Sequence, residues 1–162
     1  MDLKETKDIL NKFAKYVIKQ ARTNLTKGKK NSSKQLYDSL DYKLKVGQNS
    51  FGLSFLMEEY GAYQDQGVSG KKRKFDTPFS FKSKMPPPSS LDKWSVRKGI
   101  APRDKKGRFI KRQSLNFLIA RSIFTYGIKP SMFFTKPFEK AFNDLPPELT
   151  NAFAIDIENS IE

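Results

Sequence analysis

"SLDYKLKVGQNSFGLSFLM", residues 39–57, alternates apolar and polar side chains on both sides of a short segment, residues 47–50. A period of two on each side of a four-residue turn predicts a β-hairpin with one buried face. An isolated hairpin is only marginally stable, so we expect this face to pack against another element. The apolar positions are Leu40, Tyr42, Leu44 and Val46 before the turn and Phe51, Leu53, Phe55 and Met57 after it.

The segment before the hairpin, residues 2–27, repeats its apolar residues with the i, i+3, i+4, i+7 spacing of an amphipathic helix. Its basic residues lie mostly on the opposite face, and the Gly, Asn and Ser residues that follow predict that the helix ends near Gly28. We expect the hairpin to pack on the apolar face, which comprises Leu10, Phe13, Ala14, Val17, Ile18, Ala21 and Leu25.

The sequence after the hairpin predicts several shorter helices. Tyr60 and Tyr63, three residues apart, are typical of a helical turn. The broad apolar run at 114–126 predicts a helix with Ser114 as N-cap and Gly127 as C-cap. A short helix is expected from Pro137, and a separate amphipathic helix after the prolines at 146–147.

Residues 71–112 hold fifteen basic and three acidic residues, five of the nine prolines and no sustained periodicity. A loop of this length in a compact domain is usually functional or disordered, and its aromatic residues argue against permanent disorder. Within it, Ser90 is expected to cap a short helix that turns Leu91 and Trp94 inward and ends at Gly99.

Together these patterns predict an α+β fold in a single domain, residues 1–162. An N-terminal amphipathic helix packs on a small antiparallel sheet, a long basic loop or arm is inserted at about 71–112, and helices follow at the C-terminal side.

The composition argues against most enzyme classes. Cysteine and histidine are absent, which removes thiol nucleophiles, imidazole bases and nearly every transition-metal site. The 17 acidic residues form no spaced pattern typical of a hydrolytic or metal site. We therefore expect no catalytic residue, metal or cofactor, although an enzyme that uses tyrosine or lysine stays formally open.

Hydropathy argues against a membrane protein. Mean hydropathy is −0.65, and no apolar run approaches the roughly 20 residues of a membrane span. The polar N-terminus lacks the apolar core of a signal peptide, which predicts a protein made and kept in a cytoplasm.

The net charge of +14 suggests two basic clusters as contacts for DNA or for an acidic partner. Phe75, Trp94 and Phe109 are interleaved with these charges and are candidates for stacking on bases. A solvated loop that pairs with an acidic protein is the alternative, and nucleotide binding is rejected because no phosphate-loop motif occurs. The clusters are Lys71, Lys72, Arg73 and Lys74, and then Lys105, Lys106, Arg108, Lys111 and Arg112.

A late aromatic run, Met132, Phe133 and Phe134 with Phe138 and Phe142, fits a hydrophobic core better than an exposed protein-binding patch.

The order of motifs resembles the neck and tail-completion (tail-terminator) proteins of tailed bacteriophages, over about residues 30–145. The resemblance rests on three short motifs in sequence order. They are Tyr60, Gly61, Tyr63, Gly67 and Val68; then Pro86, Pro87, Leu91, Trp94, Lys98, Gly99 and Ile100; and then Pro130, Phe133, Phe134, Pro137, Phe138 and Ala141.

The resemblance implies a non-enzymatic virion protein, assembled in the host cytoplasm, that forms a hexameric or dodecameric ring on the axis through which the genome passes. Its neighbours would be portal or adaptor proteins or tail-tube rings, with possible contact to genomic DNA in the channel and none to a membrane. Ring contacts are heterologous, so the 71–112 arm would dock on a neighbour. The candidate interface residues are Pro86, Pro87, Leu91, Trp94, Phe133 and Phe134.

The rival class is a sequence-nonspecific nucleic-acid-binding protein that acts through the basic loop.

Overall fold

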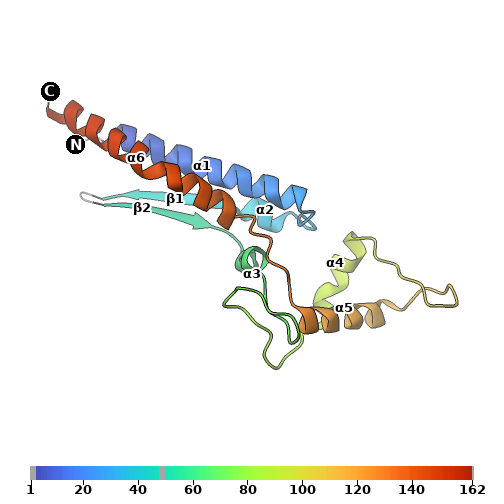
Figure 1. Ribbon diagram of the computed structural model, residues 1–162. Helices are drawn as coiled ribbons and strands as arrows, with labels where there is room; N and C mark the ends of the chain where they lie inside the picture. Colours follow the sequence, from blue (N-terminus) through green and yellow to red (C-terminus); the bar gives the residue numbers. More distant parts are fainter. Residues whose placement is uncertain (1–2, 48–49, 162) are drawn as a thin grey trace. The chain divides into compact units, whose positions relative to one another are not determined.

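The computed structural model describes residues 3–47 and 50–161 (Figure 1). The chain divides into two compact units, the first made of residues 1–58 and 132–162 and the second of residues 59–131. The predicted α+β class is confirmed, because the helices accompany one small antiparallel sheet. The single-domain assignment stays a prediction, and the inserted segment 71–112 belongs to the second unit.

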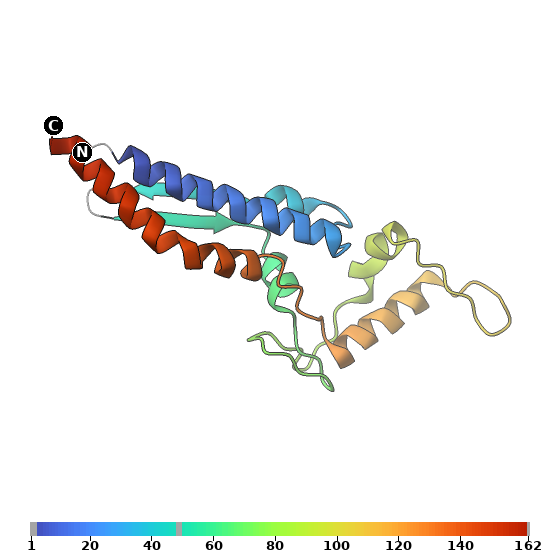
Figure 2. The same cartoon turned by 45° about the horizontal axis from the view of Figure 1, so that its top comes forward.

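The first unit is built from two long helices and the hairpin. Helices α1 (Lys4–Lys27) and α6 (Thr135–Ile161) lie side by side, and the hairpin lies along them (Figures 1 and 2). The short helix α2 (Gln35–Ser39) leads into the hairpin. As predicted, α1 ends with Gly28 as its C-cap. Segments from opposite ends of the sequence therefore form one body.

The hairpin prediction is confirmed. Strands β1 (Asp41–Val46) and β2 (Phe51–Leu56) pair antiparallel, with Asp41 opposite Leu56 and Val46 opposite Phe51. The alternation places Leu44, Leu53 and Phe55 toward the helices, where they pack on the apolar face of α1. Two residues of the predicted turn, 48 and 49, lie outside the described residues.

Two hydrophobic clusters form the core of the first unit. One surrounds Leu25 and Phe133, and the other lies where Phe13 of α1 meets Leu145 of α6 and the hairpin. Phe13, Phe55 and Phe138 meet edge to face, with ring centroids 5.8 to 6.2 Å apart. Such ring pairs add to the stabilisation from buried area.

The prediction of two separate C-terminal helices is wrong. One helix, α6, runs through Pro146 and Pro147. Proline removes an amide donor and usually breaks a helix. Here Leu145 before the prolines and Ala152 after them are both buried on the same side, which faces α1. Packing along α1 therefore holds both halves in one helix.

A buried carboxylate from α6 caps the start of α1, whose own N-cap residue, Leu3, makes no side-chain capping bond. The Asp156 carboxylate accepts the amide N–H of Glu5 and that of Thr6, each at 2.9 Å. Burial by itself would raise the pKa of Asp156, but the hydrogen bonds from Thr6 and Glu5 outweigh it and lower the pKa. The first turn of α1 is thus completed by α6.

The second unit consists of short helices joined by close backbone contacts. Its helices are α3 (Tyr60–Gln66), the 3₁₀ helix η1 (Pro88–Leu91), α4 (Asp92–Arg97) and α5 (Arg112–Tyr126). Val68 and Ile128 exchange two backbone hydrogen bonds of 2.8 Å. The helical turn at Tyr60 and the C-cap at Gly127 agree with the sequence.

Both predicted serine caps are wrong. The Ser90 hydroxyl donates to the carbonyl of Pro87 at 2.7 Å, and α4 begins at Asp92 with Leu91 in the N-cap position. Helix α5 begins at Arg112, two residues before Ser114, and Lys111 occupies its N-cap without a side-chain bond. Serine spacing alone does not fix these starts, because the 3₁₀ helix η1 leads directly into α4 and Ser114 already lies in the first turn of α5.

Among the described residues, none of the helices combines the length and the apolar character that crossing a bilayer requires.

Candidate functional site

The second basic cluster forms an ordered turn in the second unit. The Asp104 carboxylate accepts the N–H groups of Lys106 and Arg108 at 2.9 Å and the Arg108 Nε at 3.1 Å. These bonds, led by the one from the Arg108 backbone, lower the pKa of Asp104. Arg103 pairs with Phe109 across the turn in a single antiparallel bridge.

The cations of this turn are exposed, and its aromatic residue is already in contact with one of them. The Arg103 guanidinium lies 4.0 Å from the centroid of the Phe109 ring, and 65% of Phe109 is exposed. A base that stacked on Phe109 would compete with this cation–π contact for one face of the ring. Lys105, Lys106, Arg108, Lys111 and Arg112 are all exposed.

The first basic cluster is also exposed, but the structure does not bring it to the second. The N–H groups of Lys71 and Lys72 donate to Phe124 and Thr125, at the C-terminal end of α5, whereas Arg112 begins that helix. The length of α5 separates the clusters by about 20 Å. Lys74 Nζ donates to the Gly70 carbonyl, and the Arg73 guanidinium lies 5.1 Å from the Phe75 ring centroid.

The predicted arm is folded back within its own unit. Helix α4 and the 3₁₀ turn before it pack on α5, and the Asn116 amide donates to the Asp92 carboxylate. Ser95 is buried at this contact. Pro86, Leu91 and Trp94 are half-buried, and Pro87 is exposed. The segment therefore offers a partner only part of its apolar surface.

The assignment of Phe133 to a partner interface is wrong, because only 1% of this residue is exposed. It fills the core beside Leu25 and Leu40, and its carbonyl accepts the Asn24 amide at 3.1 Å. Phe134 is half-buried, with its ring centroid 5.2 Å from that of Phe55. The alternative interpretation of the aromatic run, as core, holds for Phe133.

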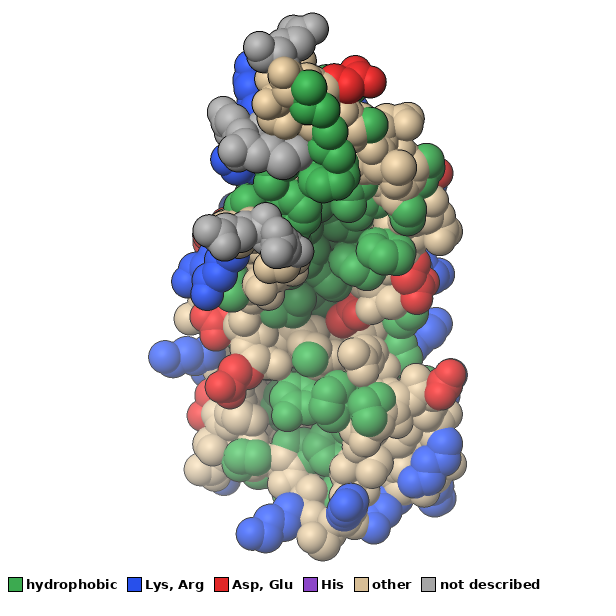
Figure 3. All heavy atoms as spheres, turned by 90° about the vertical axis from the view of Figure 1, so that its left-hand side faces the viewer, with side chains coloured by type: hydrophobic (Ala, Val, Ile, Leu, Met, Phe, Trp, Pro, Cys, Tyr) green, Lys and Arg blue, Asp and Glu red, His purple; other side chains and the backbone are tan. Residues whose placement is uncertain are grey.

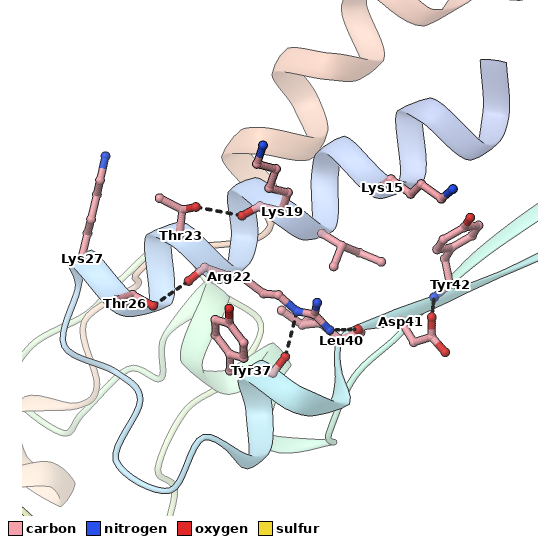
Figure 4. A pocket seen from close by; sticks show the side chains of 11 residues that line it. Lys15, Lys19, Arg22, Thr23, Thr26, Lys27, Tyr37, Leu40, Asp41 and Tyr42 are labelled. Atoms are coloured by element: carbon pink, nitrogen blue, oxygen red, sulfur yellow. Dashed lines mark hydrogen bonds between the residues drawn. The ribbon is translucent and has the colours of Figure 1, made fainter. Parts of the chain in front are cut away.

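A basic groove that the sequence interpretation did not single out lies between α1 and the segment that joins α2 to β1 (Figure 4). It encloses about 710 Å³. The Arg22 side chain crosses its floor and donates to the carbonyls of Tyr37 (3.1 Å) and Leu40 (3.0 Å). The other basic residues of its lining are Lys15, Lys19 and Lys27. Helical spacing places these residues on one face of α1, but the sequence does not show which segment would face them.

An apolar face of the first unit was also missed. Phe142, Leu149, Phe153 and Ile157 lie on one side of α6, and 49% of Phe142 and 41% of Phe153 are exposed. Hydrophobic side chains gather over the hairpin and α6 in the upper part of Figure 3. The four-residue spacing of Leu149, Phe153, Ile157 and Ile161 predicts such a stripe, but not that it is left partly uncovered.

The second unit contains an apolar pocket of about 570 Å³, which lies beside α3. Tyr63 lines it and meets Phe79 edge to face at 4.6 Å between ring centroids. Tyr60, Phe81 and Ile128 complete its apolar wall.

Among the described residues, no three acidic side chains are grouped so that they could hold a metal ion. No family model matches the sequence, no curated protein matches it, and no solved structure matches the fold.

Proposed function

We propose that the chain is a non-enzymatic structural subunit that associates with copies of itself into a hexameric or dodecameric ring, in the neck or at the head-proximal end of the tail of a tailed-phage virion. Adjacent portal, adaptor or tail-tube rings are its neighbours in this proposal, and the genome passes through its centre.

The uncovered apolar face of the first unit supports self-association most directly. Monomeric proteins rarely leave contiguous apolar surface of this kind exposed. Phe142, Phe153 and Ile157 place three large side chains in succession along α6. Beside them the hairpin has two open edges, since no further strand within the described residues pairs with β1 or β2. Open edges accept strands from other chains. Both features suit a subunit that another copy covers.

The phage assignment draws on the ordered motifs, two of which adjoin in the second unit. Gly67 lies against Ile128 and Pro130 so closely that a β-carbon on it would approach the Pro130 nitrogen to 2.6 Å. The Ser131 N–H donates to the carbonyls of Gln64 and Asp65. The tyrosine–glycine motif and the start of the proline–phenylalanine motif therefore form one local structure, which gives a physical reason for their joint occurrence.

The ring is tested by measuring mass in solution and by imaging the particles. We expect sedimentation velocity and negative-stain images to show rings of the wild-type chain. The rings form either from the purified chain alone or after the purified chain is added to virions that lack it. The double variant Phe153→Ser/Ile157→Ser should abolish assembly while its helix content is unchanged. Ile155→Ser is the matched control, because Ile155 is equally exposed but lies on the opposite side of α6.

Two results would contradict this proposal. One is a loss of assembly as complete in Ile155→Ser as in the double variant. The other is the absence of the chain, by mass spectrometry, from purified virions of the phage that encodes it.

Sequence-nonspecific nucleic-acid binding through the loop is a second candidate, favoured by the turn that Asp104 orders and by its exposed cations. A mobility-shift assay at low salt tests it. Tight binding that is lost when Lys71, Lys72, Arg73 and Lys74 are replaced by Gln would support it, and binding that survives the replacement would exclude that cluster.

A further inference from the structure

Helix α1 carries basic side chains on the face that it turns away from the core. Between Asn11 and Lys34 the sequence contains eight basic residues and no acidic one. Lys12, Lys15 and Lys19 follow one another at helical spacing on the side opposite the buried Phe13 and Val17. Cations at this spacing repel one another when no anion lies between them. A bound anion would relieve that repulsion.

The groove in the first unit concentrates this charge. Within residues 3–47 and 50–161, no acidic side chain lies at ion-pair distance from Lys15, Lys19 or Lys27. Asp41 is the single carboxylate of the lining, and it accepts the N–H of Tyr42 at 2.8 Å. The lining therefore contains three lysines and Arg22 against one carboxylate, and the groove has an excess of positive charge.

Arg22 is held in a fixed orientation in the groove. Two of its five N–H groups donate to the carbonyls of Tyr37 and Leu40, and its guanidinium lies 5.2 Å from the centroid of the Tyr37 ring. Figure 4 shows it across the floor, while the side chains of Lys19 and Lys27 point away from the floor. The remaining N–H groups are already positioned for an anion, so little side-chain entropy is lost on binding.

The rest of the lining is apolar and aromatic. Ile18 and Leu40 belong to the lining, and the rings of Tyr37 and Tyr42 stand on the side opposite α1 (Figure 4). The hydroxyls of Thr23 and Thr26 donate to carbonyls of their own helix. Because these hydroxyl protons are already used, the basic side chains are the groups that would bind an anion. Cations beside tyrosine rings are the combination with which proteins bind the phosphates and bases of nucleic-acid strands.

We propose that this groove binds the phosphate groups of a nucleic-acid strand. The four cations of the lining are spread along about three turns of α1, from Lys15 to Lys27, which fits an elongated polyanion better than a single small one. The site lies in the first unit and includes no residue of either loop cluster, and it does not depend on ring formation.

Fluorescence anisotropy with the full-length chain tests the site. The probes are a fluorescein-labelled single-stranded DNA of mixed sequence and the duplex of the same sequence, each titrated over a range of salt. The test variant is Lys15→Gln/Lys19→Gln/Lys27→Gln. Its matched control is Lys82→Gln/Lys84→Gln/Lys93→Gln, which removes the same charge from exposed lysines that belong to neither loop cluster.

We expect the groove variant to weaken single-strand binding at least about tenfold and to lower the slope of log K against log salt by about 2, since three phosphate contacts are lost. The control should change binding by less than about threefold at physiological salt, because none of its lysines lines the groove and salt screens charges that make no direct contact. Arg22→Lys keeps the charge and should weaken binding without changing the slope. Preference for the single strand or for the duplex identifies which form of nucleic acid the groove accepts.

Three outcomes would overturn the proposal. They are the absence of binding by the wild-type chain at low salt, an equal loss in the groove variant and its control, and displacement of the oligonucleotide by polyglutamate as efficiently as by polyphosphate of equal charge. The last would assign the groove to an acidic protein segment. Circular dichroism of each variant shows that a loss of binding is not a loss of fold.

Discussion

The two units of this chain are stabilised internally in different ways. The first unit buries large apolar side chains from α1, α6 and the hairpin, and both hydrophobic clusters of the described residues belong to it. The second has only Val68, Leu115 and Ala120 as buried hydrophobic residues, alongside four buried polar ones, Asp65, Ser69, Ser95 and Asn116. In place of a large core, the second unit relies on backbone contacts around Gly127. The first unit should therefore be sensitive to lost side-chain volume, and the second to added volume.

Removing a core side chain from the first unit is expected to have the largest effect. Phe133→Ala should lower the free energy of unfolding by about 3–5 kcal/mol, because it empties a fully buried aromatic site. Urea denaturation followed by far-UV circular dichroism measures the loss. Phe142→Ala is the control, since the same side chain is half exposed there, and its cost should be about 1 kcal/mol or less. Equal losses in the two variants would contradict the comparison.

Adding one carbon to the second unit should have the next largest effect. Gly127 has φ +75 and ψ −171, a region that only glycine readily occupies, and a β-carbon there would meet the Val68 carbonyl and the Gly70 nitrogen. Gly127→Ala should cost more than about 2 kcal/mol. Gly107→Ala is the control, because Gly107 also has positive φ but open space around it, and it should cost only about 1 kcal/mol.

The fluorescence of Trp94, the one tryptophan of the sequence, reports on the second unit in this experiment. We expect the unfolding transition that Trp94 fluorescence reports to occur at a lower urea concentration in Gly127→Ala, while the rate of hydrogen exchange in the middle of α1 is unchanged. If both units lose protection together, their stabilities are not separate and the contrast between them fails.

The smallest effect is expected at the polar contact between α1 and α6. The pKa of Asp156 is lowered in the folded state, so its ionised form stabilises the first unit above about pH 4, and this contribution is lost as pH falls through the folded-state pKa. Asp156→Asn should lower the melting temperature at neutral pH and reduce its dependence on pH in the acid range.

The control for this substitution is Asp144→Asn, an exposed carboxylate on the same helix. It should leave both the melting temperature and its acid dependence nearly unchanged. An identical pH profile for wild type and Asp156→Asn would contradict the assignment of the cap.

The sequence predicts best those elements whose signal is local. Alternation in 40–57 and helical spacing in 2–27 each repeat several times, so the hairpin, α1 and their mutual packing follow from the pattern. The two prolines at 146–147 misled the prediction because the rule against proline is also local, whereas the contact of α6 with α1 is not. The serine caps failed because the backbone places Leu91 and Lys111, and not a serine, in the N-cap positions of α4 and α5.

The candidate sites were harder to predict. Exposure of the loop cations could be anticipated from charge alone, and the structure places them on the surface. The groove could not be anticipated, because lysines on the outer face of a helix ordinarily point to solvent. What distinguishes Lys15 and Lys19 is that the turn from α2 into β1 stands opposite them, held by the bonds from Arg22. Phe133 shows the converse, since a motif residue suited to an interface is buried in its own unit.

The cap on α1 sets an order of events during synthesis. The carboxylate of Asp156, which completes the helical turn at Thr6, is added to the growing chain 150 residues after Thr6. The whole of residues 59–131 is translated in that interval, so the second unit has all of its residues before the first can close. Domains generally fold as units while the chain grows. For this protein we therefore expect the middle of the sequence to fold first, and α1 to reach its final packing only after α6 has been synthesised.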